Sequence, residues 1–188
     1  MDKIEILGIV GSLRKDSYNH NALKAAQKLV PDGATLNLVE LIGIPVFNQD
    51  NESELPAAVI EFKRRIVAAD AILFATPEYN YSVPGPLKNA IDWASRPHGE
   101  SAWQGKPAAV MGASPGNLGS ARAQYHLRQI LVALDMPVVN DPEVMISNAA
   151  QKFDQDGTLT DEPTKRRIQK LLVALLQLTK SIPAKKLK

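Results

Sequence analysis

Two segments combine residue types that suit a phosphate and a flat ring, and each directly follows an apolar run. The first, Gly11–Asn19, reads GSLRKDSYN and places short hydroxyls beside the guanidinium of Arg14. If a helix begins here, its unpaired backbone N–H groups and positive dipole end would favour a phosphate monoester. The alternative is that Ser17 or Asn19 only caps the helix and that Arg14 is solvated. Neither GxGxxG nor GxxxxGK[ST] occurs, which disfavours a classical dinucleotide fold and a Mg-dependent nucleotide hydrolase.

The second segment, Pro77–Trp93, reads PEYNYSVPGPLKNAIDW and alternates tyrosines with polar residues. A rigid loop with outward amides can hydrogen-bond the edge of a heteroaromatic ring, while Tyr79 and Tyr81 can flank its face. The alternative is an aromatic loop that packs on its own helix. A third segment, Ser114–Gly119, contains glycines that permit close backbone approach, although glycines also serve ordinary turns.

The elements that must position these segments follow from periodicity. Short apolar, β-branched runs predict buried strands, and apolar residues at helical spacing predict helices between them. Alternating strands and helices predict an α/β fold in which a parallel sheet carries helices on both faces. The flavodoxin-like order 2-1-3-4-5 fits best, with its switch point between strands one and three, where the first two segments lie. The expected strands are 4–10, 34–41, 71–76, 107–112 and either 137–139 or 144–146, and the expected helices are 21–30, 57–69, 87–94, 121–134 and 165–179.

Length and composition set further bounds. The 188 residues predict one domain over 1–180 and a basic, mobile tail over 181–188. The chain has no cysteine, so disulfides and thiol chemistry are excluded and redox chemistry would need a bound cofactor. No segment resembles a signal peptide or a membrane span, which predicts a cytoplasmic protein without membrane insertion. Removing the four lysines of the last nine residues from the 22 basic residues leaves 18 against 20 acidic ones, which disfavours nucleic-acid binding.

Together with Gln124–Gln129, which reads QYHLRQ, the first two segments resemble the NAD(P)H-dependent FMN reductase family. The similarity is greatest to bacterial quinone reductases that are also described as chromate reductases and azoreductases. It covers the chain from Lys3 to about Ile146. The resemblance implies that FMN is the cofactor and that NADPH or NADH is the co-substrate. It also implies side chains or backbone groups that bind FMN: Ser12, Arg14, Ser17, Tyr18 and Asn19 at the phosphate and ribityl chain, Pro77, Glu78, Tyr79 and Asn80 along the ring, and Ser114 and Gly116 completing the pocket.

The implied reaction passes a hydride from NAD(P)H to flavin N5 and then two electrons to a quinone or a similar small acceptor, with chromate, azo compounds and free flavin as further candidates. No catalytic acid or base is required, and the scattered His20, His98 and His126 do not predict a metal site. One alternative is a flavodoxin-type electron carrier without its own NAD(P)H turnover. Another is a sensing protein that keeps the fold but not the flavin.

The resemblance also implies a homodimer or a homotetramer. Arg122, Tyr125 and Glu143 are similar to the polar residues that this branch uses between dimers. The alternative is that these three residues form a solvated helix face. The sequence leaves open whether NADH or NADPH is preferred and which acceptor is physiological.

Overall fold

The computed structural model describes residues 3–182 and contains one five-stranded parallel sheet of order β2-β1-β3-β4-β5. The α/β class and the flavodoxin-like strand order predicted from the sequence are both confirmed. Of the two positions considered for the last strand, the one at 144–146 is correct. Val138 makes only a single bridge to Ala108. The strands are β1 Ile4–Val10, β2 Ala34–Glu40, β3 Ala71–Ala75, β4 Ala108–Ala113 and β5 Val144–Ile146.

Five α-helices connect and follow the strands, and their caps explain where they start. The first helix begins at Tyr18 rather than at residue 21, because the Ser17 hydroxyl accepts a hydrogen bond from the Asn19 N–H. The last helix is longer than expected because Asp161 caps it by accepting from the Thr164 N–H. The helices are α1 Tyr18–Lys28, α2 Ala57–Ala68, α3 Gly85–Ala94, α4 Ala121–Ala133 and α5 Glu162–Ser181, with short 3₁₀ turns at Gln49–Asn51 and Ala149–Gln151.

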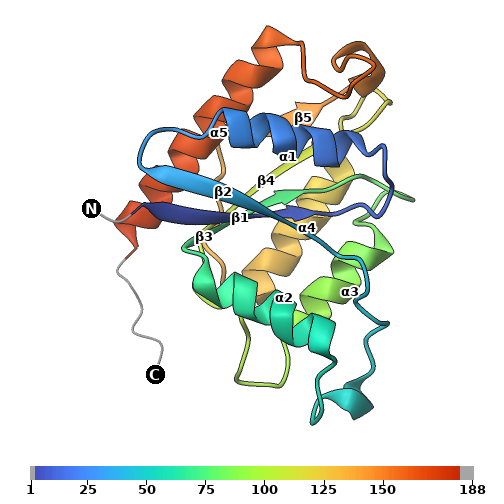
Figure 1. Cartoon of the computed structure of the whole chain (residues 1–188), viewed down its shortest axis with the longest axis vertical. Helices are drawn as coiled ribbons and strands as arrows, with labels where there is room; N and C mark the ends of the chain where they lie inside the picture. The colour runs from blue at the N-terminus through green and yellow to red at the C-terminus, as the bar shows by residue number, and fades with distance from the viewer. Residues whose placement is uncertain (1–2, 183–188) are drawn as a thin grey trace.

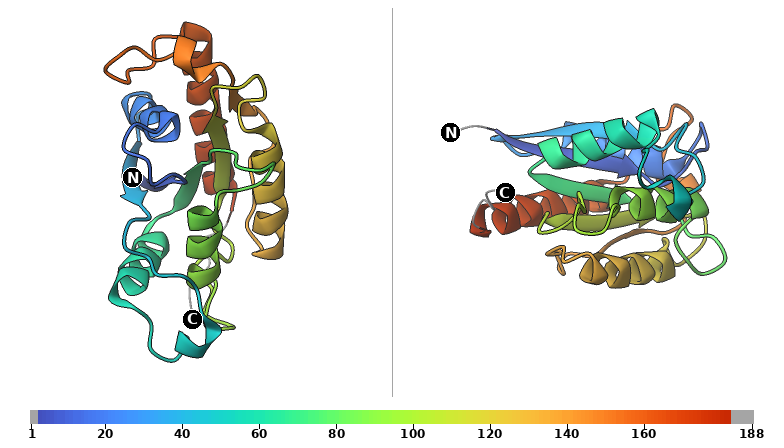
Figure 2. Two further views of the ribbon diagram at one scale, coloured as in Figure 1. Left: turned by 90° about the vertical axis from the view of Figure 1, so that its right-hand side faces the viewer. Right: turned by 90° about the horizontal axis from the view of Figure 1, so that it is seen from below.

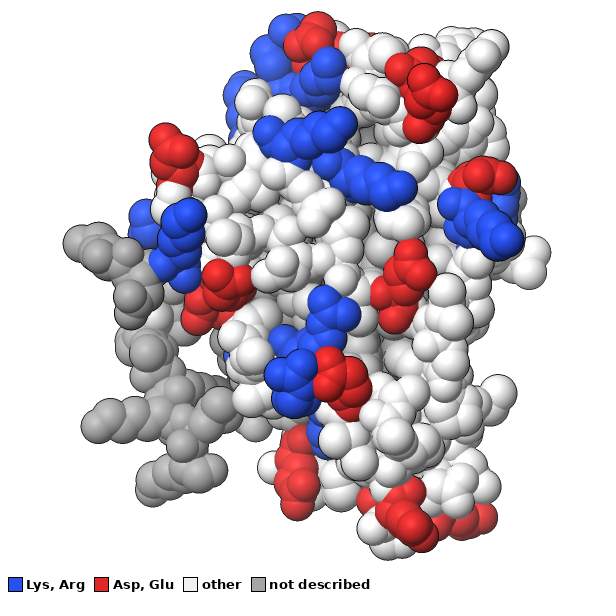
Figure 3. All heavy atoms as spheres, viewed as in Figure 1, with Lys and Arg blue, Asp and Glu red and all other residues white. Residues whose placement is uncertain are grey.

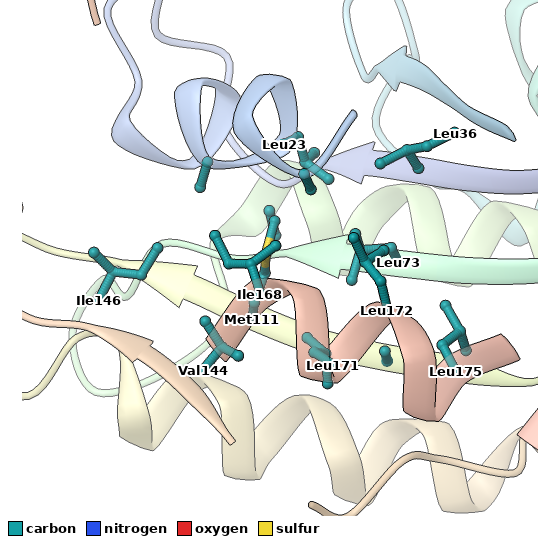
Figure 4. Packing of buried hydrophobic residues seen from close by; sticks show 14 of the residues in the cluster. Leu23, Leu36, Leu73, Met111, Val144, Ile146, Ile168, Leu171, Leu172 and Leu175 are labelled. Atoms are coloured by element: carbon teal, nitrogen blue, oxygen red, sulfur yellow. The ribbon is translucent and has the colours of Figure 1, made fainter. Parts of the chain in front are cut away.

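The helices lie in two layers, one on each face of the sheet (Figures 1 and 2). One layer consists of α1 and α5, whose Leu23, Ile168 and Leu172 pack on the strands in the cluster drawn in Figure 4. The other layer consists of α2, α3 and α4, and its core includes Phe62 and Trp103. The apolar burial on both faces explains why the central strands read as continuous hydrophobic runs.

Strand β1 lies between β2 and β3, and Val10 pairs with Ala75 at the carboxyl ends of β1 and β3. Because all the strands are parallel, the loops after β1, β3 and β4 leave from the same edge of the sheet. The site predicted from the sequence would therefore lie at this edge. Within residues 3–182, no helix is long and apolar enough to cross a membrane. Most of the expected basic tail, residues 183–188, lies outside the described part of the chain.

Candidate cofactor site

The loop after β1 passes tightly over the end of β3 and then opens to solvent. The Gly11 N–H donates to the Ala75 carbonyl at 2.9 Å, and a Cβ on Gly11 would lie only 2.8 Å from that oxygen. Beyond it, the Ser12 hydroxyl accepts a hydrogen bond from the Arg14 N–H at 3.3 Å. Arg14 is exposed, and no carboxylate within residues 3–182 pairs with its guanidinium. A free cation thus stands beside the N-terminus of α1, which is a favourable arrangement for an anion.

The last three residues of this segment, Ser17, Tyr18 and Asn19, are more buried. Ser17 is 4% exposed and caps α1, as one of the two sequence interpretations expected. The ring of Tyr18 packs against Phe153, with centroids 5.6 Å apart. Asn19 is 3% exposed; its Nδ2 donates to the Ala113 carbonyl at 2.9 Å, and its Oδ1 accepts from the Ala113 N–H at 2.8 Å. The amide of Asn19 therefore faces the end of β4, and its contact with the cofactor, which the resemblance implies, stays a prediction.

After β3 the chain forms a tight turn over Tyr79–Ser82, here called the aromatic turn. Tyr79 and Ser82 exchange two backbone hydrogen bonds of 3.1 and 3.0 Å. The central residues Asn80 and Tyr81 have φ of 49° and 66°, as a type I′ turn requires. A positive φ is uncommon for a tyrosine, and such strain is retained where surrounding contacts determine the backbone. Tyr79 is 51% exposed and Tyr81 65%, so both rings stand at the mouth of the sheet.

The aromatic turn is tied to α4, which follows the neighbouring strand. The Glu78 carboxylate accepts hydrogen bonds from the backbone N–H groups of Arg122 and Ala123, at 3.0 and 3.3 Å, and pairs with the Arg122 guanidinium. That guanidinium also lies 3.6 Å from the centre of the Tyr81 ring. Farther along α4, His126 Nδ1 lies 3.0 Å from the Ser82 hydroxyl. The second loop is thus fixed by several side chains rather than by its own backbone alone.

The loop after β4 is held by the segment that follows β5. The Asn148 and Ala149 N–H groups donate to the carbonyls of Gly116 and Ser114, both at 3.0 Å. The Gly116 N–H donates to the Ser114 hydroxyl at 3.1 Å. A Cβ on Gly116 would meet nothing closer than that hydroxyl, at 3.5 Å. No neighbouring atom in the chain therefore requires glycine at 116, which differs from Gly112, where a Cβ would lie 1.9 Å from the Ser120 hydroxyl.

The structure thus brings all three predicted segments to one edge but divides their residues into two groups. Residues of the outer group face or border solvent, and the side chains of the inner group contact other parts of the chain. Sequence reasoning missed the partners of the inner group, above all Arg122 and Ala123 as the partners of Glu78. The QYHLRQ motif was used only for the family resemblance, and the structure places its His126 beside Ser82 of the aromatic turn. The outer group is Ser12, Arg14, Tyr79, Asn80, Ser114 and Gly116, and the inner group is Ser17, Tyr18, Asn19, Pro77 and Glu78.

The donor set suits FMN. A hydroxyl, a free guanidinium and a helix N-terminus form one end of the edge and match a phosphate. An exposed aromatic turn and a glycine-containing loop form the other end, where a flat ring could lie against backbone and tyrosine. A doubly wound sheet that presents such loops at its switch point defines a flavodoxin-like FMN-binding protein.

Comparison with known proteins agrees with this class and identifies the family within it. The family model for NADPH-dependent FMN reductases matches residues 4–151, and the chain belongs to that family. It is 56% identical over 175 residues to an NAD(P)H-dependent FMN reductase of Pseudomonas aeruginosa, covering 93% of this chain and 94% of the relative. It is 46% identical over 189 residues to an NAD(P)H:quinone oxidoreductase of Solanum tuberosum, covering 97% and 96%. The solved structure of FerB, a flavoenzyme NAD(P)H:(acceptor) oxidoreductase from Paracoccus denitrificans, superimposes with a TM-score of 0.87 at 41% identity over 95% of this chain and 98% of FerB.

These findings confirm the family resemblance, the enzyme class and the pairing of FMN with NAD(P)H that the sequence suggested.

Proposed function

We propose that the chain uses FMN, held by the three loops, to transfer two electrons from NADPH or NADH to quinones. The observation that carries this proposal is the meeting of the Arg14 loop and the aromatic turn at one sheet edge, in a chain of the FMN reductase family. When bound, FMN supplies the redox chemistry by taking a hydride from the nicotinamide and passing two electrons to the acceptor.

The role of the protein in this proposal is to bind and orient. Ser12, Arg14 and the capped N-terminus of α1 hold the phosphate through charge-assisted and backbone hydrogen bonds. Backbone groups from Pro77 to Asn80 lie along the ring, and Ser114 and Gly116 complete the pocket. Tyr18 supports this end of the site from below through its contact with Phe153. No side chain is assigned as a proton donor or acceptor.

Quinones are the favoured acceptor class because two-electron reduction needs only that a flat acceptor replaces the nicotinamide at the ring. The relative from Solanum tuberosum is named an NAD(P)H:quinone oxidoreductase, which is in line with this class. Chromate, azo compounds and free flavin are proposed as further acceptors on the sequence resemblance. A pure electron carrier of the flavodoxin type is not favoured, because the similar full-length relatives are named as reductases.

We further propose that the protein forms a homodimer or a homotetramer. Among the large side chains with at least half of their surface exposed are Leu13 in the loop after β1, Leu118 in the loop after β4 and Tyr125 on α4. Tyr125 also donates to a Glu143 carboxylate oxygen at 3.3 Å on the exposed side of α4. Sedimentation at micromolar concentration should show a dimer or a tetramer, and a monomer alone would contradict the proposal.

We also propose a cytoplasmic location, without nucleic acids or membranes as partners. The distribution of charge on the surface is in line with this proposal. Basic and acidic side chains are interspersed on the face shown in Figure 3, so no single-sign field covers it. Cell fractionation of a tagged chain that recovered it with membranes would contradict this assignment.

The function is tested by recording the absorbance spectrum of the purified protein from 300 to 600 nm, anaerobically, before and after NADPH or NADH. Flavin bands that bleach, and that return when benzoquinone is added, are the expected result. Bands that persist with both nicotinamides would favour an electron carrier. No flavin bands after incubation with FMN would contradict the proposed cofactor.

A further inference from the structure

Two side chains at the site join loops that are far apart in the sequence. The Asn19 amide binds both backbone groups of Ala113, 94 residues away, and so joins the loop after β1 to the end of β4. The Glu78 carboxylate binds the backbone of Arg122 and Ala123, 44 and 45 residues away, and so joins the loop after β3 to the start of α4. Each contact is a clamp between one cofactor loop and the β4–α4 segment.

The Glu78 clamp also serves α4 directly. Ser120, which precedes α4, has a left-handed backbone and makes no capping hydrogen bond with its side chain. The Ala121 N–H donates to the Leu118 carbonyl, whereas the N–H groups of Arg122 and Ala123 donate to the Glu78 carboxylate. A carboxylate at this position is favoured by both hydrogen bonding and the helix dipole. Glu78 supplies this cap from another loop. The start of α4 and the aromatic turn are consequently held as one unit.

The Asn19 clamp is equally specific because it is buried. Its two hydrogen bonds are 2.9 and 2.8 Å long, and Asn19 and Ala113 each contribute one donor and one acceptor. Loss of the amide would leave both the N–H and the C=O of Ala113 without these partners inside the protein. The side chain is thereby committed to the end of β4.

We propose that the side chains of Asn19 and Glu78 are positioning groups, which set the spacing of the three cofactor loops through these clamps. This rests on the proposed function, since it concerns the affinity of the same site for FMN. A site distributed over three loops binds well only if the loops are already in register, because any ordering on binding would reduce the affinity. The clamps provide that preorganisation.

The proposal is tested by preparing the apoprotein of Asn19→Ala and Glu78→Gln and titrating each with FMN under conditions where the protein is folded. We expect the FMN Kd to rise by at least about tenfold in each variant, in line with the loss of one or two net hydrogen bonds. Glu78→Gln keeps the shape of the side chain and a neutral acceptor, so it tests the proposal even if Asn19→Ala fails to fold. The midpoint potential of the bound flavin should stay near that of the wild type.

Matched controls come from similar groups away from the site. Glu61 pairs with Arg64 on the exposed side of α2, and the Asn37 amide donates to Glu5 on the β2 side of the sheet. Glu61→Gln and Asn37→Ala remove comparable interactions and should leave the FMN Kd within about twofold of the wild type. Urea unfolding of every apoprotein separates a change in global stability from a change in affinity.

Three results would overturn the positioning roles. One is an unchanged FMN Kd in both clamp variants, even if their unfolding free energy falls, because the contacts would then be merely structural. Another is a shifted midpoint potential with an unchanged Kd, because Glu78 would then act on the ring directly. The third is an equal loss of affinity in the controls. Failure of the proposed function is distinguishable, since the wild-type protein itself would then bind no FMN.

Discussion

The loop after β1 and the loop after β3 both leave a buried parallel strand and enter a helix, yet they hold their polar groups differently. Arg14 in the first loop is exposed and has no carboxylate partner within residues 3–182. In the second loop, Glu78 and Ser82 both bind residues of α4. The Arg14 guanidinium in the first loop therefore stays available for an anion. In the second loop, polar side chains instead hold the strained aromatic turn through their contacts with α4.

The difference shows that one site can use one loop to recognise a charged group and another loop to provide a rigid surface. A phosphate gains from charged donors that no other group engages, and an exposed guanidinium is hydrated until the phosphate binds. A ring needs a surface of fixed shape, and the contacts of Glu78 and Ser82 provide that shape. Substitutions in the two loops should consequently have different signatures in stability and in affinity.

The largest effect is expected for Gly112→Ala, which would disturb the packing of β4 against the start of α4 and the end of β3. A Cβ at this position would lie 1.9 Å from the Ser120 hydroxyl and 2.3 Å from the Thr76 carbonyl. We expect the free energy of unfolding to fall by about 2–3 kcal/mol, as for other overpacked sites, and FMN binding to weaken with it. Urea unfolding measures the change. Gly85→Ala is the control, because no heavy atom lies within 4 Å of its Cβ position; equal stability of the two variants would contradict the steric argument.

Arg14→Ala, in the loop after β1, should have the opposite signature: weaker FMN binding with unchanged stability. Removal of a charge-assisted hydrogen bond to a phosphate should weaken FMN binding by about 1.5–3 kcal/mol, or roughly ten- to hundredfold in Kd. The stability of the apoprotein should not change, because Arg14 has no ion-pair partner to lose among residues 3–182. FMN titration and urea unfolding give the two readings. The neighbouring exposed Lys15→Ala is the control, and an equal loss of affinity there would indicate a diffuse charge effect.

Tyr81→Gly sharpens the comparison by separating the backbone of the aromatic turn from its ring. Glycine adopts the observed φ of 66° without strain, which should stabilise the apoprotein by about 1 kcal/mol. Loss of the stacked Arg122 should offset this by about 0.5–1 kcal/mol at an exposed site. We expect nearly unchanged unfolding but a raised KM for quinone at constant kcat. A large loss of stability would mean that the ring, rather than the Glu78 clamp, holds the turn.

The smallest effect concerns His20, on the first turn of α1. Burial, followed by the nearby Lys24, lowers the pKa of His20, while Glu40 opposes them. Because the folded pKa lies below the unfolded value of about 6.5, the folded state disfavours the charged form. Stability should therefore be complete above about pH 6.5 and decline as the pH falls through the folded pKa. Thermal unfolding of His20→Gln should show a smaller decline over that window than the wild type, and an identical decline would assign it to other groups.

The sequence predicted the fold better than it predicted the side-chain contacts within the site. Apolar runs such as 71–76 are typical of strands that are buried on both faces of a parallel sheet. The strand order and the three loops could therefore be derived from the sequence pattern alone. Ser17 as a helix cap was also foreseeable, because capping is local. The inward positions of Asn19 and Glu78 were not foreseeable, because their partners lie 94 and 44 residues away and a polar side chain in a loop or at the start of a helix gives no sign of which direction it takes.

The clamp between Asn19 and Ala113 has a consequence for the order in which the protein is made. During synthesis, β1, β2 and β3 emerge first and already contain the Arg14 loop and the aromatic turn. Neither Asn19 nor Glu78 can reach its partner until β4 and the start of α4 have left the ribosome, because those partners are Ala113, Arg122 and Ala123. Contacts of such large sequence separation form late in folding. A nascent chain therefore completes its cofactor site only after about two thirds of its 188 residues have been joined, and a truncated chain that stops before α4 has no clamped site in which to retain FMN.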